Sequence, residues 1–492
     1  MTNLSGPARP PHADIDEEDL NTSANPRFGD VLDARLSRRS VLRGGVGTAA
    51  STLFGGVALA GLGAGSTSAT AATAYGAYKN DQAITSLAFT PVAKSVADAV
   101  SVPPGYSAHV VVALGDPLDA NTPEYRNDGT DTGFEHRSGD HHDGMEFFGL
   151  SGDGRRVDRK GSVRGLLAIN HEATSNRDVR SHFLHPTGGT LNPRPAGEAD
   201  KEMALHGISV VEVRKTAGRF AYVRNSPHNR RVTPLTPVEL SGPAAGHAMM
   251  ATRFSPAGVT TRGTINNCGT GMTPWGTYLS GEENWSGYFH RGDDAALRTA
   301  TDGGKSNTSL ARYGRGPRAA SRHGWETAGA DDRFARWDIT QRAGSDATAD
   351  YRNEINAFGW MVELDPYNRS AAVRKRTALG RFAHESAAFG LCVAGQPLAA
   401  YLGDDSRGEY IYKFVSEAAW NEADREHADR MATGNKYLDR GRLYVARFDA
   451  DGSGEWIELS IADPRIAGHA GYAFADQADV LINARLAADT NL

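Results

Sequence analysis

Several motifs whose chemistry is well understood are missing from this sequence. The chain contains no GxSxG segment that would present a nucleophilic serine, no glycine-rich P-loop and no CxxC pair. A serine-hydrolase function and a nucleotide-switch function therefore have no support in the sequence.

Excess positive charge is also missing. The 53 Lys and Arg residues and the 59 Asp and Glu residues are intermixed and give a net charge of −6. A protein that holds a nucleic-acid polymer along a groove needs a basic stripe on its surface. We therefore expect no nucleic-acid partner of that kind.

Cysteine is scarce, and the two cysteines lie in different contexts. Cys268 lies between Asn-Asn and Gly-Thr-Gly, whereas Cys392 belongs to the small apolar run FGLCVAG. We interpret Cys392 as a buried strand residue and Cys268 as the chemically reactive cysteine. In an exported chain the two could instead form a disulfide, and this alternative stays open.

The N-terminal part contains no bulky aliphatic block of the kind that anchors a protein in a membrane. Residues 37–43 read SRRSVLR and are followed by a weakly apolar, glycine-rich stretch and by small residues at 68–74. This order predicts a twin-arginine export signal within residues 1–74, behind a polar and disordered N-terminus. We expect the twin-arginine export machinery as a partner and a periplasmic or extracellular location.

The remaining residues, 75–492, are predicted to form one propeller-like domain. The 56 glycines and 22 prolines favour many short strands over long helices. Strand-like runs end in turn residues, which is typical of an all-β propeller or a large sandwich, although no repeat of fixed period is found. The predicted strands cover residues 108–114, 163–170, 207–213, 276–280, 358–364, 398–402, 409–415, 443–448 and 456–459.

Three segments depart from this pattern. Residues 291–352 are polar and glycine-rich and are predicted to form a long insertion, either a lid or a loop. Residues 416–434 are predicted to form a helix with Ser416 as N-cap and Gly434 as stop. Residues 476–489 are predicted to form a second helix, because their apolar residues recur on one face.

The stretch from 266 to 285, NNCGTGMTPWGTYLSGEENW, concentrates the candidate chemistry. It places Cys268 beside a glycine-rich bend, a strand-like segment and the pair Glu282 and Glu283. A thiolate and carboxylate oxygens on adjoining strands can bind a hard or borderline metal ion. The alternative is a tight turn, a strand with an aromatic core residue and a solvated acidic tip.

Similar acidic clusters recur at other predicted strand ends. Asn170-His171-Glu172 closes one strand and offers oxygen and nitrogen ligands for a cation. In His384-Glu385 only one side chain can enter a site, because neighbouring strand residues point to opposite faces.

The segment GDDSRGEY contains Asp404, Asp405, Arg407 and Glu409. Its carboxylates can hold a cation while Arg407 binds phosphate oxygens. Residues 449–455 have calcium-loop character, but their spacing is incomplete and we interpret them as a hairpin turn.

These segments together resemble the PhoX-type alkaline phosphatases, which are exported by the twin-arginine route. The resemblance covers residues 89–489. It is carried, in the family's order, by NRRVT, GPAAGHA, NNCGTGMTPWGTYLSGEEN, FGWMVELDP, RTALGRFAHE and YLGDDSRGEYIYKFVS.

The resemblance implies a six-bladed β-propeller whose central site holds ferric iron and calcium and hydrolyses small phosphate monoesters. It implies Cys268 as an iron ligand and Glu172, Glu283, Glu385 and Asp404 as carboxylate metal ligands. Arg407 and Asn170 are the candidate substrate-binding residues. Such grouped carboxylates repel one another unless cations are present.

Members of this family continue beyond the segment RLAAD, through a motif of the form MDRPEW. We therefore expect a propeller that is incomplete at its C-terminus. Whether such a protein is active or inactive stays open. Two other functions also stay open: a propeller hydrolase using calcium alone, such as a lactonase or phosphotriesterase, and a non-catalytic, calcium-stabilised extracellular binding module.

Overall fold

A computed structural model describes residues 90–174, 184–185, 187, 189, 191–449 and 451–491. The predicted export signal lies outside these residues. Two compact units divide the chain, and the elements discussed below belong to the unit that contains Val112–Asp449 and Ser453–Leu492. Among the described residues, no helix has the length and apolarity that crossing a membrane requires.

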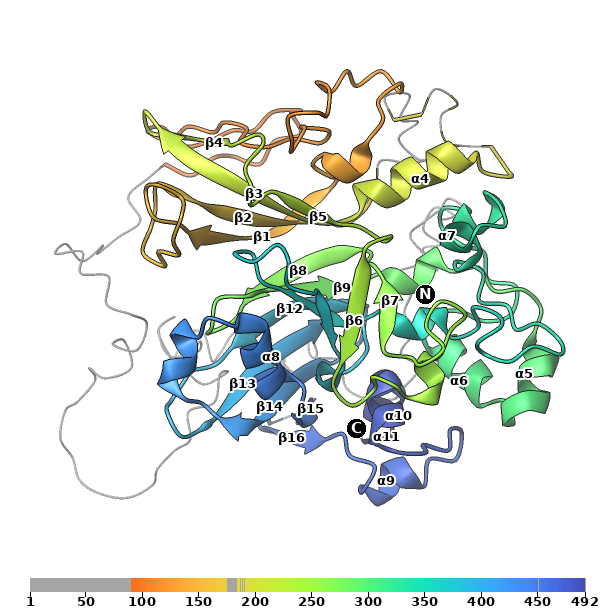
Figure 1. Cartoon of the computed structure of the whole chain (residues 1–492). Helices are drawn as coiled ribbons and strands as arrows, with labels where there is room; N and C mark the ends of the chain where they lie inside the picture. The colour runs from red at the N-terminus through yellow and green to blue at the C-terminus, as the bar shows by residue number, and fades with distance from the viewer. Residues whose placement is uncertain are drawn as a thin grey trace, which may run out of the picture. The chain divides into compact units, whose positions relative to one another are not determined.

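Three β-sheets form the framework of this unit (Figure 1). Sheet 1 contains β1 (His142–Gly149), β2 (Arg164–His171), β3 (Gly207–Thr216), β4 (Arg219–Tyr222) and β5 (Arg230–Val232). Sheet 2 has the order β7-β6-β11-β10-β9-β8, with β6 (Pro237–Ser241), β7 (Thr260–Arg262), β8 (Asn267–Met272), β9 (Tyr278–Glu282), β10 (Met361–Leu364) and β11 (Arg374–Arg376). Sheet 3 contains β12 (His384–Phe389), β13 (Pro397–Asp404), β14 (Ile411–Ala419), β15 (Gly441–Phe448) and β16 (Gly454–Glu458) in sequence order.

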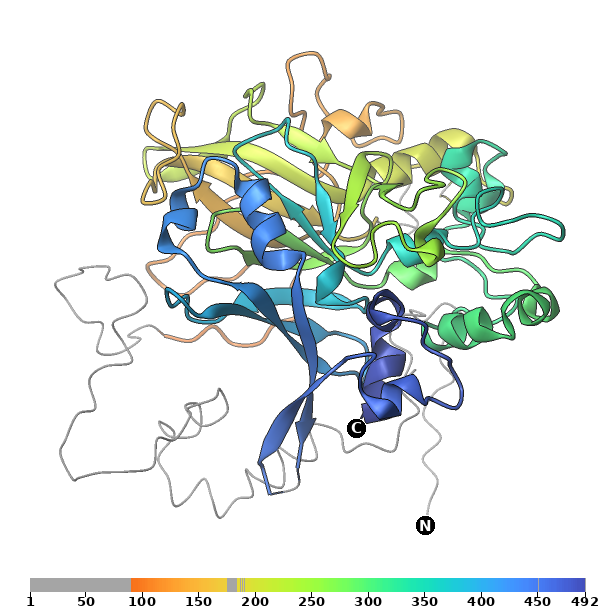
Figure 2. The ribbon, with the colours of Figure 1, turned by 60° about the horizontal axis from the view of Figure 1, so that its bottom comes forward.

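Short helices connect and cover the sheets. The α-helices are α4 (Ala196–Leu205), α5 (Ala295–Asp302), α6 (Lys305–Arg312), α7 (Asp332–Ala335), α8 (Arg430–Leu438), α9 (Pro464–Ala467), α10 (Gln477–Ile482) and α11 (Ala484–Asn491). Single turns of 3-10 helix are η2 (Phe134–His136), η3 (Ala248–Met250), η4 (Trp285–Tyr288), η5 (Trp325–Thr327), η6 (Glu354–Ala357), η7 (Thr377–Leu379) and η8 (Glu422–Glu426). Figure 2 shows α10 and α11 beside sheet 3, next to α5 and α6.

Sheet 2 lies between the other two sheets. On one side, its residues Tyr278 and Val362 share an apolar cluster with Leu166 of sheet 1. On the other side, Leu279 and Met361 share a cluster with residues of sheet 3. Successive residues of β9 and β10 therefore face different sheets, as the alternation of side chains along a strand requires. Both faces of these two strands are therefore buried.

The edge strands β1, β8 and β12 lie next to one another, with β8 in the middle. A Cβ atom on Gly269 of β8 would overlap the carbonyl oxygen of Glu385, and one on Gly271 would overlap that of Ala387. Alternate glycines in the sequence CGTGM therefore allow the backbone of β12 to approach β8 closely. This approach brings the three edge strands to a common centre.

The mainly β-sheet fold predicted from the sequence is confirmed. The predicted strands from residue 163 onward correspond, with shifted ends, to β2, β3, β9, β10, β13, β14, β15 and β16. The predicted hairpin around residues 449–455 is confirmed, since β15 and β16 pair antiparallel. The six-bladed propeller and its incomplete C-terminus stay predictions.

The strand predicted over residues 108–114 is wrong, because no strand is formed there. The amide of Ala113 donates to the side chain of Asp116, and the amide of Asp116 donates back to the carbonyl of Ala113. The segment therefore ends in a local turn.

The helix predicted over residues 416–434 is also wrong. Ser416 lies within β14, where it pairs with Gly441, and its hydroxyl accepts a hydrogen bond from the amide of Leu398. Helix α8 begins only at Arg430, and Gly434 lies inside it. A Cβ atom at Gly434 would overlap the buried side chains of Arg376 and Glu363, so glycine allows α8 to pack closely.

The helix predicted over residues 476–489 is confirmed in part, because two helices occupy this segment. Asp476 caps α10 by accepting a hydrogen bond from the amide of Asp479. Asn483 separates α10 from α11, and its amide group donates to the hydroxyl of Tyr472 and to Asp479. Its side-chain oxygen accepts a hydrogen bond from Ser309, which ties this break to α6.

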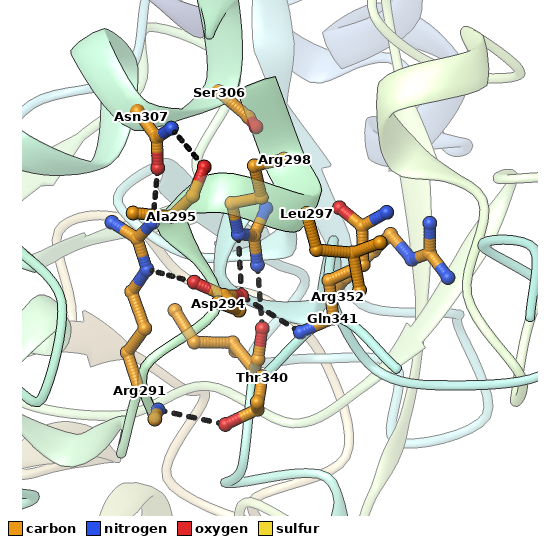
Figure 3. Close-up of polar contacts among 12 residues, drawn as sticks. Arg291, Asp294, Ala295, Leu297, Arg298, Ser306, Asn307, Thr340, Gln341 and Arg352 are labelled. Carbon is orange, nitrogen blue, oxygen red and sulfur yellow. Dashed lines mark hydrogen bonds and ion pairs between the residues drawn. The ribbon is translucent and has the colours of Figure 1, made fainter. Parts of the chain in front are cut away.

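Residues 291–352, the predicted insertion, contain helices α5, α6 and α7. The buried carboxylate of Asp294 accepts hydrogen bonds from Arg291 (2.7 Å), Arg298 (2.6 Å) and the Gln341 amide (2.8 Å) (Figure 3). Burial acts to raise the pKa of Asp294, but these donors together hold it below its usual value. Buried ion pairs thus stabilise this segment, together with apolar side chains such as Trp325, Trp337 and Ile339, which belong to a buried hydrophobic cluster.

Candidate functional site

The edge hairpins of the three sheets share one local structure. In each, a pair of residues is in register and the pairing then shifts through a β-bulge in the edge strand. The pairs are His142 with His171, Asn267 with Glu282, and His384 with Asp404. Bulges redirect side chains and are common beside functional sites.

Each hairpin supplies two potential ligand residues, each one residue after a member of the pair. The bulges contain Asp143, Cys268 and Glu385. The partner strands are directly followed by Glu172, Glu283 and Asp405. We call these six residues the ligand cluster.

The same backbone hydrogen bond anchors the second ligand residue in all three hairpins. The amide of Glu172 donates to His141 (3.1 Å), that of Glu283 to Asn266 (3.0 Å), and that of Asp405 to Ala383 (3.0 Å). In each case the acceptor is the carbonyl two residues before the bulge ligand. The three hairpins are therefore equivalent in structure, although their sequences share no fixed-period repeat.

The side chains of the ligand cluster converge around Cys268. One group comprises Asp143, Glu172 and Cys268, and a second comprises Cys268, Glu283 and Glu385. Within each group the candidate ligand atoms lie within 4.8 Å of one another. Cys268 belongs to both groups, so its sulfur lies where two cation subsites would meet.

The electrostatics of the cluster favour bound cations. Burial, and then hydrogen bonding to and repulsion by Asp405, raise the pKa of Glu283 to about 9. Burial and the charge of Glu283 hold the pKa of the Cys268 thiol well above its usual range. Burial also raises the pKa of Glu385. Positive charge within the cluster would reverse these shifts and keep the groups ionised.

The donor set fits the metal ions that the resemblance to the PhoX-type phosphatases implies. Oε2 of Glu385 is buried and has no hydrogen-bond partner, so one carboxylate oxygen is available to a cation. Carboxylate oxygens suit calcium, and a thiolate among carboxylates suits a transition-metal ion such as iron. The residues present can therefore hold both kinds of ion.

A second polar layer lies beneath the cluster. Buried Glu282 accepts a hydrogen bond from Lys375 (2.7 Å), and buried Asp404 accepts two from Arg485 (2.7 and 2.8 Å). His171 shares the hydroxyl of Ser209 with Arg231. A basic side chain thus lies near the second member of each in-register pair, that is, near Glu282, Asp404 and His171.

Asp404 was predicted as a metal ligand, but it is not part of the ligand cluster. Its carboxylate pairs with Arg485, and its neighbour Asp405 contacts Glu283 instead. Side chains of successive residues at a strand end point in different directions, so only one of the two can face the cluster. Cys268, Glu172, Glu283 and Glu385, the other predicted ligands, are brought together.

The two predicted substrate-binding residues differ in environment. Asn170 is fully buried, and its amide group donates to the carbonyls of Cys268 and Gly269 while its oxygen accepts from Tyr278 and Ser280. Asn170 therefore supports the Cys268 bulge from below. Arg407 is exposed in the turn between β13 and β14, and its contact with phosphate stays a prediction.

Sequence reasoning missed Asp143, and of the two carboxylates in GDDSRGEY it chose Asp404 as the ligand in place of Asp405. Asp143 precedes Gly144, as Cys268 precedes Gly269, and small residues at this position admit the neighbouring edge strand. A search for an acidic or thiol residue followed by a small residue at a strand start would have found Asp143. For the His-Glu pair, the prediction that one side chain enters is confirmed: Glu385 joins the cluster, whereas His384 bonds to the carbonyl of Gly380.

Both cysteines are free thiols, so the disulfide alternative is wrong. Cys392 is not a buried strand residue as predicted. It is partly buried in the loop between β12 and β13 and packs against the apolar cluster of sheet 3. The residues before and after it, Leu391 and Val393, are exposed.

Comparisons with known proteins agree with this geometry. A family model described as alkaline phosphatase PhoX matches residues 87–492. A solved structure, Pseudomonas fluorescens PhoX in complex with vanadate, a transition state analogue, is 38% identical in sequence, with a TM-score of 0.67. The match covers 82% of this chain and 63% of that chain. No curated protein matches.

Proposed function

Since this chain belongs to the PhoX alkaline phosphatase family, we propose that it hydrolyses small phosphate monoesters at cations held by the ligand cluster. The observation that carries this proposal is the convergence of three equivalent hairpins on the shared thiol of Cys268. Because the chain spans less than two thirds of the similar solved PhoX chain, its activity is part of the proposal.

We assign the metal ions by the chemistry of the donors. Cys268, Glu283 and Glu385 would hold ferric iron, because this group contains, beside the shared thiolate, the carboxylate oxygen without a protein partner. Asp143 and Glu172 would hold calcium, with Cys268 between the two subsites. Asp405, the second ligand residue of the hairpin in sheet 3, would bind beside Glu283.

The cations would polarise the phosphoryl group and compensate the negative charge that develops on its oxygens. The protein's own residues orient this centre. The hydrogen bonds from Asn170 fix the Cys268 bulge, and the layer of Lys375 and Arg485 lowers the cost of placing several carboxylates side by side. Arg407 is the candidate for binding substrate phosphate, because its guanidinium can contact two phosphate oxygens.

The solved relative was studied with vanadate as a transition state analogue, and we propose that this chain binds vanadate in the same way. We further propose export by the twin-arginine route, on the basis of residues 37–43. A hydrolase that uses calcium alone would leave Cys268 without a function, so the iron-containing site is the better proposal.

The test combines elemental analysis with activity on p-nitrophenyl phosphate. The wild-type protein should contain iron and calcium, and Cys268→Ala should lose the iron and more than about 100-fold of the activity. Cys392→Ala is the matched control, because it removes the other free thiol outside the cluster. Full activity in Cys268→Ala, or wild-type protein without either metal, would disprove the proposal.

A further inference from the structure

Asn266 combines a strained backbone with complete burial, two residues before Cys268. Its φ angle is 49°, and its exposed fraction is 0%. Residues other than glycine adopt this left-handed conformation at an energetic cost, which asparagine tolerates better than most. Strain of this kind at a candidate site justifies asking what the residue does there.

The hydrogen bonds of Asn266 connect ligand residues from two sheets. Its side-chain amide donates to the backbone carbonyl of Glu172, at 3.0 Å, and lies 3.5 Å from the carboxylate of that residue. Its own backbone carbonyl accepts from the amide of Glu283, at 3.0 Å. Its side-chain oxygen accepts from the amide of Asn284, at 2.6 Å. One residue of sheet 2 thus holds the ends of β2 and β9 at a fixed separation.

The position of Asn266 is itself held from behind. The hydroxyl of Tyr288 lies 3.4 Å from the side-chain amide of Asn266 and 3.0 Å from Nε2 of His206. All three side chains are buried. The equivalent residue in sheet 3 is Ala383, which supplies the same backbone carbonyl but has no polar side chain. The link across hairpins is therefore a property of the Asn266 side chain and not of the repeated backbone structure.

We propose that Asn266 is a positioning residue that fixes the distance between Glu172 and Glu283, and thereby sets the affinity of the two subsites joined at Cys268. This inference rests on the proposed metal site. Asn266 contacts no reacting atom in this role. Its removal should widen the cluster and weaken cation binding without removing a ligand.

The first test is Asn266→Gly, which keeps the left-handed backbone accessible and deletes the side chain with its carboxamide. After removal of metal with a chelator, calcium binding is measured by calorimetry. Calcium affinity should fall by about 10-fold to 100-fold, the range found when residues that orient metal ligands are removed. The number of calcium ions bound at saturation should stay that of the wild type.

Asn225→Gly is the matched control, because Asn225 also has a positive φ angle, 64°, and lies outside the ligand cluster. It should leave calcium affinity unchanged. Tyr288→Phe provides a second measurement if Asn266→Gly does not fold. It removes one hydroxyl behind Asn266 and should weaken calcium binding by about threefold to tenfold. The effects of the two substitutions should not be additive in the double variant, because both act through one contact.

Calcium affinity within twofold of the wild type in both Asn266→Gly and Tyr288→Phe would overturn the positioning role. An equal loss in Asn225→Gly would also overturn it, since backbone flexibility alone would then explain the effect. Wild-type protein that binds neither calcium nor iron would overturn the proposed function and this inference together. Intact metal binding by the wild type separates failure of the inference from failure of the function.

Discussion

Neighbouring acidic residues of this protein occupy opposite environments. Asp404 is buried and neutralised by Arg485, whereas Asp405 lies against Glu283 in the ligand cluster. The sequence GDDSRG predicted an acidic site at this turn but could not indicate which of the two carboxylates faces it, since this depends on the register of β13. The register is visible only in the pairing of His384 with Asp404.

The two carboxylates should therefore respond differently to neutralisation. Asp404→Asn leaves the buried guanidinium of Arg485 without its main partner, and we expect a loss of about 3–5 kcal/mol in the free energy of unfolding. Asp405→Asn should cost little stability but should reduce metal content. Chemical denaturation and elemental analysis of both variants measure this difference. The reverse pattern, with metal loss only in Asp404→Asn, would contradict the assignment.

Buried histidine makes the fold sensitive to acid. Burial, and then the charge of His323, lower the pKa of His206 to about 3, while an unfolded histidine titrates near 6.5. Between these values the unfolded chain binds more protons than the folded one, so stability falls as pH decreases from 6.5 toward 3. The pKa of Glu202 is also lowered, so protonation of Glu202 reduces stability further at the lower end of this window.

His206→Gln should therefore flatten the dependence of stability on pH. One histidine contributes up to about 1.4 kcal/mol per pH unit in this window. Urea denaturation between pH 6.5 and 4 measures the slope for the wild type and the variant. An unchanged slope would show that His206 does not carry this part of the acid sensitivity.

Among the structural elements, β8 illustrates why sequence patterns located some strands and missed others. The apolar run RGLLAIN predicted β2 correctly, because both faces of that strand are buried. Strands β1 and β8 begin with the sequences HDG and NCGTG, whose polar and glycine residues are typical of turns. They form strands because neighbouring backbones pack against those glycines, which is a tertiary effect and is not visible in local propensity.

The packing of β8 against β12 should be highly sensitive to added volume. Gly269→Ala would place a methyl group on the carbonyl of Glu385, so we expect a destabilisation of more than about 3 kcal/mol or failure to fold. Gly197→Ala is the matched control, because a Cβ atom there meets no neighbouring atom and α4 gains a better helix former. Equal stability of the two variants, measured by thermal unfolding, would contradict the close approach of the edge strands.

Buried ion pairs contribute to the stability of the insertion beside its apolar packing. Asp294 is the shared acceptor for Arg291 and Arg298, so Asp294→Ala would leave two buried cations without their carboxylate. We expect a loss of about 3–5 kcal/mol in the free energy of unfolding, which is typical when one partner of a buried ion pair is removed. Asp293→Ala, which removes an exposed partner of Arg318, is the control and should change stability by less than about 1 kcal/mol. A small effect of Asp294→Ala in the same urea titration would show that the ion pairs do not hold the insertion.

At the scale of the whole molecule, three equivalent hairpins meet at one centre. Motifs in the sequence identified Cys268, Glu172, Glu283 and Glu385, which the structure brings together. The place of Asp143 in the cluster and the equivalence of the three hairpins become visible only through the shared bulges and backbone hydrogen bonds. Sequence patterns do not show these features. The framework of several sheets is what places side chains from distant parts of the chain within reach of common cations.

The most direct test of this account is anomalous X-ray diffraction from crystals of the purified protein, measured at the iron absorption edge. The account predicts a strong anomalous peak at bonding distance from the sulfur of Cys268, with Glu283 and Glu385 as further ligands of the iron. Absence of a peak at Cys268, or an iron site elsewhere in the molecule, would contradict it.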